Sequence, residues 1–176
     1  MNIGVFCSQY DVAEKYTKAA EELAQLIASG GHTLVWGGAD EGLMGLVARV
    51  VQEGGGKTIG VMREALRAKA KKDADEMHIV ANAYEMNLGI IERSDCVVAL
   101  VGGIGTLNEV SEIIRMNKNG RRAKNVVFVS TDGFYDGLKM QIQRMSDEGF
   151  MRKDVADSVY FAASPKEAMG YIEKTR

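Results

Sequence analysis

Cysteine and histidine are scarce in this sequence of 176 residues, which contains two of each. Cys7 and Cys96 both lie in apolar, strand-like runs, where a cysteine usually packs as a small buried hydrophobic residue, so we expect no disulfide. His32 and His78 stand alone, without the ligand spacing of a zinc or other transition-metal site. The sequence therefore predicts no structural metal.

Long apolar runs and a strong net charge are also missing. No apolar stretch approaches the roughly 20 residues needed to cross a bilayer, and residues 1–8 resemble a short strand rather than a signal peptide. The formal net charge of -2 gives no basic field to attract nucleic acid or an anionic membrane. We therefore expect a cytoplasmic protein with neither kind of partner, in which any phosphate is bound locally.

Strand-like runs alternate with amphipathic helical patterns along the whole chain, which is typical of βαβ units around a parallel sheet. The expected strands span residues 2–7, 33–36, 58–62, 78–80, 96–101, 126–130 and 158–161. The expected helices span residues 12–28, 43–52, 84–93, 107–117, 135–148 and 165–174, the last with a capping box that begins at Ser164. The sequence predicts an α/β fold: one domain over residues 1–176, with a Rossmann-like parallel sheet and helices on both faces.

Two connections carry clusters of basic residues. Residues 63–76 contain five cations followed by three acids and have little apolar periodicity, so we interpret them as a mobile, solvated connection. A lid over a site is the minority interpretation. Gly120, Arg121 and Arg122 are interpreted as a surface turn before the next strand.

Three loops follow strand ends and would open on the same carboxyl edge of a parallel sheet, where such folds bind ligands. The first loop, residues 7–10, offers Ser8 and backbone amides for a base or ribose, although a plain strand-to-helix turn is equally compatible. In the second loop, residues 37–45, and the third loop, residues 101–109, glycines at a helix start favour phosphate binding. The candidates for binding phosphate and nucleotide are Ser8, Gly37, Gly38, Gly42, Met44, Gly45, Gly102, Gly103, Gly105 and Thr106.

Neither glycine loop matches the dinucleotide fingerprint or the Walker pattern, so no NAD or P-loop triphosphate site follows, and we expect no cofactor. Glu109 ends the third loop, and residues 106–109 also read as a capping box, which the residues alone favour over a catalytic role. Glu112 follows on the same helix face and is a candidate neighbour of Glu109.

In these loops the chain resembles the LOG (Lonely Guy) family, often labelled as lysine decarboxylases. Residues 37–45 are similar to the family motif GGGxxGLMG, and residues 101–109 to PGGxGTxxE, with Val101 in place of the proline. Asp132-Gly133-Phe134-Tyr135 and Glu148-Gly149-Phe150 resemble two further family segments, so the resemblance covers nearly the whole chain. The resemblance implies a phosphoribohydrolase that acts on cytokinin riboside monophosphates and AMP. It also implies a homodimer, because members of the family are commonly dimers.

One departure from the family pattern concerns its catalytic pair, an arginine and the motif glutamate. Counting back from Asp95 aligns residues 83–87 with the family motif MHxRK, so Met86 replaces the arginine and Asn87 the lysine. Glu109 then remains as the catalytic residue, with Met86, Asn87 and Glu112 as possible further site residues. Arg93 lies two helical turns further on, and a substitute from residues 63–67 or from a partner subunit stays open.

The resemblance implies a hydrolase that cleaves the N-glycosidic bond of purine or cytokinin nucleoside 5′-monophosphates into free base and ribose 5-phosphate. A non-catalytic protein that binds nucleoside monophosphates is the alternative, favoured by the loss of the arginine. We reject lysine decarboxylation because that chemistry needs a pyridoxal-phosphate lysine, and none of the three loops contains lysine.

Overall fold

The computed structural model describes residues 1–118 and 124–175 of the chain. Its strands are β1 (Asn2–Phe6), β2 (Thr33–Trp36), β3 (Lys57–Arg63), β4 (Glu76–Val80), β5 (Cys96–Ala99), β6 (Val126–Val129) and β7 (Val159–Ala162). Its α-helices are α1 (Glu14–Ser29), α2 (Gly42–Glu53), α3 (Ala83–Arg93), α4 (Ile104–Lys118), α5 (Asp136–Asp147), α6 (Lys153–Ala156) and α7 (Pro165–Lys174). Two short 3-10 helices are η1 (Glu64–Lys69) and η2 (Thr131–Gly133).

The described strands form one parallel sheet in the order β4-β3-β2-β1-β5-β6-β7. The chain first builds outward from β1 to β4 and then returns to place β5 on the other side of β1. The neighbours β1 and β5 therefore flank the topological switch point, where open α/β sheets have their ligand crevice at the carboxyl edge.

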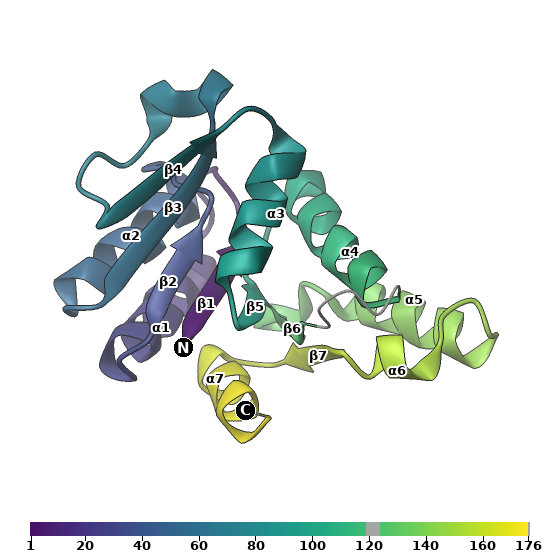
Figure 1. Cartoon of the computed structure of the whole chain (residues 1–176). Coiled ribbons are helices and arrows are strands. Elements are labelled where there is room, and N and C mark those ends of the chain that lie inside the picture. Colours follow the sequence, from purple (N-terminus) through teal and green to yellow (C-terminus); the bar gives the residue numbers. More distant parts are fainter. Residues whose placement is uncertain (119–123, 176) are drawn as a thin grey trace.

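Helices cover both faces of the sheet (Figure 1). One core cluster packs α1, α2 and α7 against the sheet, and the other packs α3 and α4 against it together with Tyr135. Side chains alternate between these cores along each strand: Leu34 and Trp36 belong to the first cluster and Val35 to the second. Because both faces are buried, the central strands are apolar throughout, as parallel strands usually are.

The predicted α/β fold is confirmed. All seven expected strands are present, with ends displaced by one or two residues, and α7 has the expected bounds. Its N-cap is also confirmed, because Ser164 Oγ accepts a hydrogen bond from the Glu167 N–H at 3.2 Å. The turn predicted at Gly120, Arg121 and Arg122 lies outside the described residues.

One local prediction was wrong, and the structure adds contacts to a second. Helix α4 begins at Ile104, three residues before the expected start, which places Thr106 inside the first helical turn rather than at the cap. The solvated character expected of residues 63–76 is confirmed, because most of them are exposed, but η1 and the residues after it are also hydrogen-bonded to the second loop. Both segments lie at the carboxyl edge of the sheet.

Candidate functional site

The first and third loops meet at the switch point between β1 and β5. The Ser8 N–H donates to the Val101 carbonyl at 3.1 Å, and the Leu100 N–H donates to the Phe6 carbonyl at 3.0 Å, so the pairing continues beyond both strands. Ser8 is half-buried, and its Oγ accepts a hydrogen bond from the Tyr10 N–H at 3.0 Å. This bond fits the turn that the sequence left as an equal alternative, and it holds the Ser8 hydroxyl at the carboxyl edge of the sheet.

The second loop is packed tightly against the first. Gly42, the first residue of α2, has φ +51°, and a Cβ there would lie 2.4 Å from the Gln9 carbonyl carbon and oxygen. Gly38 has φ +77°, and its Cβ would lie 3.0 Å from Met77 Sδ and 3.2 Å from Met62 Cβ. Glycine is required at both positions by the left-handed backbone and by the close approach of neighbouring atoms.

The remaining glycines of the second loop are buried as well. A Cβ on Gly37 would lie 2.5 Å from Met44 Cε, and one on Gly45 would lie 2.6 Å from the Asp40 carbonyl carbon. Trp36 Nε1 also donates to the Ala39 carbonyl at 3.2 Å. Gly37, Gly38 and Gly45 therefore shape a rigid turn, and packing accounts for their presence without a ligand.

Residues 63–76 pass over the outer side of the second loop. An antiparallel bridge joins Ala39 to Ala70, the Asp40 N–H donates to the Lys69 carbonyl at 3.1 Å, and the Lys71 N–H donates to the Gly38 carbonyl at 2.9 Å. Lys69 Nζ also reaches a carboxylate oxygen of Glu41 at 2.9 Å. The segment is thus hydrogen-bonded to the second loop.

Lys71 is a buried cation that the sequence did not single out. It is 5% exposed, and its Nζ lies 2.8 Å from Asp73 Oδ1 and 3.8 Å from Asp40 Oδ1. A buried ammonium group needs carboxylate partners of this kind. The run of charged residues in the sequence does not indicate which of its lysines is buried with such partners. Lys71 therefore anchors the 63–76 segment to the second loop.

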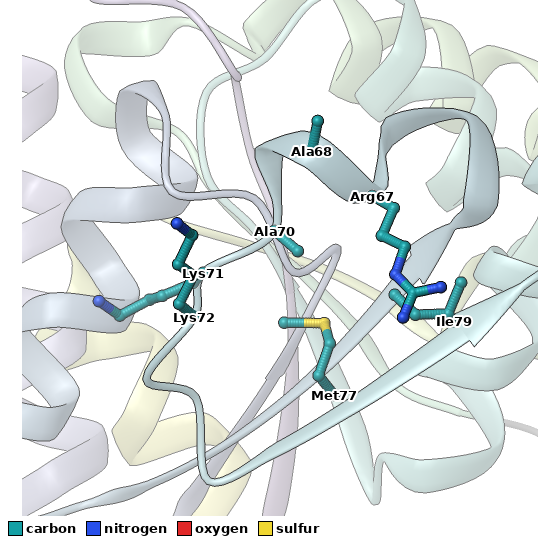
Figure 2. A pocket seen from close by; sticks show the side chains of 7 residues that line it. All are labelled: Arg67, Ala68, Ala70, Lys71, Lys72, Met77 and Ile79. Carbon is teal, nitrogen blue, oxygen red and sulfur yellow. The ribbon is translucent and has the colours of Figure 1, made fainter.

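A cavity of about 490 Å³ lies under the 63–76 segment (Figure 2). Its lining residues are Arg67, Ala68, Ala70, Lys71, Lys72, Met77 and Ile79. Figure 2 shows Arg67 extending toward Ile79, whereas Lys71 and Lys72 point away from Arg67. The three cations therefore do not converge on one point, and the cavity lacks the geometry of an anion cradle.

The third loop is more exposed than the second loop. Gly103, Ile104 and Gly105 are exposed, and the Leu107 N–H donates to the Gly103 carbonyl at 3.1 Å as α4 begins. The N–H groups of the first turn of a helix have no intrahelical partner and carry a partial positive charge. Gly103 and Gly105 thus leave the start of α4 uncovered for an anion such as phosphate.

Gly102 and Thr106 pack against each other within this loop. Thr106 is 4% exposed, and a Cβ on Gly102 would lie 2.2 Å from its Oγ1. Because α4 already begins at Ile104, the predicted capping box of Thr106 with Glu109 was wrong. Glu109 is consequently not required to cap the helix.

Glu109 lies in the second turn of α4 and is half-buried. Burial raises the pKa of its carboxyl to about 7. The buried Cys7 thiol at the end of β1 has a raised pKa, first from its own burial and then from the charge of Glu109, which places the carboxyl near the first loop. A carboxyl that titrates near neutral pH at the carboxyl edge of the sheet is suited to general acid–base chemistry.

The segment after β6 supports the third loop from the side. Tyr135 Oη donates to the Leu100 carbonyl at 2.7 Å, and burial raises the pKa of the phenol, which remains neutral. Asp132, which adopts φ +55°, pairs with Lys15 of α1. The similarity of residues 132–135 to a family motif was the signal for this support, but the partners could not be read from the sequence.

The three further candidates differ in their surroundings. Met86 packs on the core between α3 and the sheet, and Asn87 beside it is buried with an unpaired side-chain Oδ1. Glu112 binds Arg115 through two hydrogen bonds of 2.9 and 2.5 Å, which lower the pKa of Glu112. Glu112 is therefore the ionised partner of an arginine.

No arginine is seen to pair with Glu109 among the described residues. Arg93 Nη1 donates to the Gly89 carbonyl at 3.1 Å near the end of α3, and Arg67 pairs with Glu64 at 3.6 Å. Arg63 ends β3 and makes no ion pair with the described part of the chain. The described residues also contain no cluster of three His, Cys, Asp or Glu side chains fit for a metal ion, and no helix able to span a membrane.

Comparison with known proteins identifies relatives along almost the whole chain. The model of a family described as "Possible lysine decarboxylase" matches residues 44–172. A cytokinin riboside 5′-monophosphate phosphoribohydrolase of Arabidopsis thaliana is 35% identical over 172 residues, which are 96% of this chain and 75% of the relative. The enzyme of the same name from Mycobacterium tuberculosis is 31% identical over 169 residues, 95% of this chain and 90% of the relative.

A solved structure is similar over a comparable range. The molybdenum cofactor binding protein of the phototrophic bacterium Rippkaea orientalis is 26% identical, with a TM-score of 0.74 over 99% of this chain and 96% of its own. The same sheet therefore supports proteins with different names and ligands, and the choice of function rests on the residues of the crevice.

Proposed function

The chain belongs to the LOG family, the family of the matching model, and from that premise we propose that it hydrolyses the N-glycosidic bond of purine or cytokinin nucleoside 5′-monophosphates. The observation that carries this proposal is Glu109, whose half-buried carboxyl with a pKa of about 7 lies one turn below the open start of α4. The products are the free base and ribose 5-phosphate.

The phosphate is proposed to bind at the first turn of α4, where Gly103 and Gly105 leave the backbone amides accessible. In the reaction, the bond between C1′ and the base nitrogen breaks, and its electron pair leaves with the base. Water adds its oxygen to the cationic C1′, and the proton that the water loses is taken up by the base. Ionised Glu109 stabilises the ribosyl cation and orients the water, as carboxylates do in glycosidases.

The experiment follows base and ribose 5-phosphate by chromatography after incubation with AMP, N6-substituted AMP and other nucleoside monophosphates. Glu109→Gln should lower kcat by about 100- to 1,000-fold, by analogy with removal of one transition-state contact, while nucleotide binding persists. Glu112→Gln, on the same helix but paired with Arg115, is the matched control and should retain activity. Equal release by the wild type and Glu109→Gln would refute the role of Glu109.

A binding protein without turnover is the second candidate, and Met86 in place of the family arginine is the observation that favours it. The similarity to a molybdenum cofactor binding protein is in keeping with a binder on this fold. Saturable binding of AMP in calorimetry, together with no release of base, would select this candidate.

Lysine decarboxylation, named in the family description, does not suit the lysines of this chain. Among the lysines whose burial is described, Lys71 is buried, and its ammonium is held by Asp73 and Asp40. A pyridoxal-phosphate enzyme needs a lysine free to form a Schiff base with the cofactor. Lys71 instead serves the packing of the second loop.

The active assembly is proposed to be a homodimer. An apolar cavity of about 470 Å³ lies between α4, α5 and α6, lined in part by Ile114, Leu138, Ile142 and Met145. Phe150 borders this cavity and is 80% exposed, so its ring extends the apolar lining to the surface. Light scattering should give a dimer mass for the wild type and a monomer mass for Phe150→Ser, and a monomeric wild type would exclude this assembly.

A further inference from the structure

Asn87 in α3 carries a buried polar group that has no partner among the described residues. Its side chain is 6% exposed, and Oδ1 accepts no hydrogen bond from the described residues. Leaving a buried carbonyl oxygen unpaired is unfavourable, so in native proteins such a group usually meets a donor from the protein, an ordered water or a ligand. The position also departs from the family motif, which has lysine there.

A second buried asparagine, Asn117, has a structural role and serves as a comparison for Asn87. Asn117 is likewise 6% exposed, but its Nδ2 donates to the Lys124 carbonyl at 2.8 Å and to Ser158 Oγ at 3.0 Å. Its Oδ1 accepts from the Lys124 N–H at 2.9 Å. Asn117 therefore joins α4 to the strands beyond it, whereas Asn87 makes no comparable connection.

The orientation of α3 places Asn87 toward the switch point. A Cβ on Gly89 would lie 2.9 Å from Val61 Cγ1, so the Gly89 flank of α3 rests on β3. Residues two apart on a helix point in nearly opposite directions, which puts Asn87 on the other flank, toward β1 and α4. Ile91, one turn further along that flank, shares a core cluster with Val110 and Ile113 of α4.

Asn87 and Glu109 lie at comparable depths below the carboxyl edge. Helices α3 and α4 both follow strands of the parallel sheet, both contact β1, and they stand on the same face in Figure 1. Asn87 is the fifth residue of α3 and Glu109 the sixth of α4, which corresponds to about 6 to 8 Å of rise from each helix start. The two side chains therefore stand at similar heights on two helices of the same sheet face.

We infer that Asn87 Oδ1 accepts a hydrogen bond from the 2′-hydroxyl of the bound nucleotide and so selects ribonucleotides over 2′-deoxyribonucleotides. The identity of the ligand rests on the proposed function. If Glu109 acts at C1′, the 2′-hydroxyl on the adjacent carbon is a hydrogen-bond donor for which an unpaired acceptor on α3 is suited. An analogue that lacks the hydroxyl leaves its hydrogen-bond partner in the site unpaired. Such an analogue therefore binds much more weakly than the substrate.

The test is calorimetric binding of AMP and 2′-deoxy-AMP to the wild type, Asn87→Leu and Asn117→Leu. The wild type should bind AMP on the order of tenfold more tightly than 2′-deoxy-AMP, the factor that one hydrogen bond supplies. Asn87→Leu should lose affinity for AMP alone, which brings the ratio close to one, and Asn87→Ala should do the same. Asn117→Leu should keep the ratio of the wild type.

Thermal unfolding separates a binding role from a structural one. Asn117→Leu breaks three hydrogen bonds and should lower Tm, whereas Asn87→Leu removes an unpaired buried group and should leave Tm equal or higher. Equal affinity of the wild type for both nucleotides, an unchanged ratio in Asn87→Leu, or no binding of AMP would overturn the inference. Because calorimetry measures binding, a protein that binds AMP without hydrolysing it refutes the proposed function and leaves this test intact.

Discussion

The second and third loops have similar glycine content and similar places in the fold, yet they differ in burial. The second loop is enclosed by the first loop, by Met77 and by the 63–76 segment, and its glycines at 37, 38 and 45 are buried. The third loop leaves Gly103 and Gly105 exposed, with Glu109 directly behind them. Glycines of one loop thus serve packing, and those of the other give a ligand access to a helix start.

The largest expected effect concerns the pH dependence of turnover in the third loop. With a pKa of about 7, Glu109 is ionised above neutral pH, so kcat should rise with pH through 7 and level off above it. At pH 5 the rate should be about 100-fold below the plateau, since ionisation falls tenfold per pH unit. A rate that falls as pH rises through 7 would show that protonated Glu109 is the active form.

The second loop should respond to substitution through stability. Gly42→Ala introduces a Cβ at φ +51° that would lie 2.4 Å from the Gln9 carbonyl, and should lower the free energy of unfolding by about 2 to 5 kcal/mol. Gly55→Ala is the matched control, because Gly55 has φ +78° with no atom within 4 Å of the added methyl, and should cost only about 1 kcal/mol. Similar losses for both variants in urea unfolding would mean that the contact with the first loop is unimportant.

Glu109 should also make stability depend on pH. Its pKa is higher in the folded state, at about 7, than the usual value of 4.5, so the folded chain binds the proton more tightly. Stability from this group is therefore full below pH 4.5 and declines as pH rises through 7. At pH 8, Glu109→Gln should be about 1 to 3 kcal/mol more stable than the wild type, and nearly equal to it at pH 4. If Glu109→Gln were less stable than the wild type at pH 8, burial of the ionised Glu109 carboxylate would not be destabilising.

The smallest expected effect comes from Gly105→Ala, which tests whether Gly105 gives a ligand access to the start of α4. Gly105→Ala should stabilise α4 by about 0.5 kcal/mol, or raise Tm by roughly 1 to 2 °C, because no atom lies within 4 Å of the added methyl. It should nevertheless raise KM for AMP, since the methyl stands beside the open amides. Gly137→Ala, at the second position of α5, is the control with the same gain and no change in KM. An unchanged KM in Gly105→Ala would place the phosphate elsewhere.

The sequence was sufficient for the order of strands and helices because apolar runs and caps such as Ser164 are local signals. The start of α4 was misjudged because residues 106–109 have the pattern of a capping box, whereas the observed helix already includes Gly105 and Thr106. Lys71 was missed because its burial depends on packing against the second loop, which is distant in sequence, whereas its nearer partner Asp73 belongs to the same run of charges. The unpaired Oδ1 of Asn87 depends on tertiary packing and has no local signature.

The most direct measurement is a crystal structure of Glu109→Gln with AMP bound. The account predicts the 5′-phosphate at hydrogen-bond distance from the N–H groups of the first turn of α4, with C1′ beside residue 109 in the crevice between α3 and α4. A phosphate at the start of α2, or a glycosidic bond far from residue 109, would contradict the assignment of chemistry to the third loop.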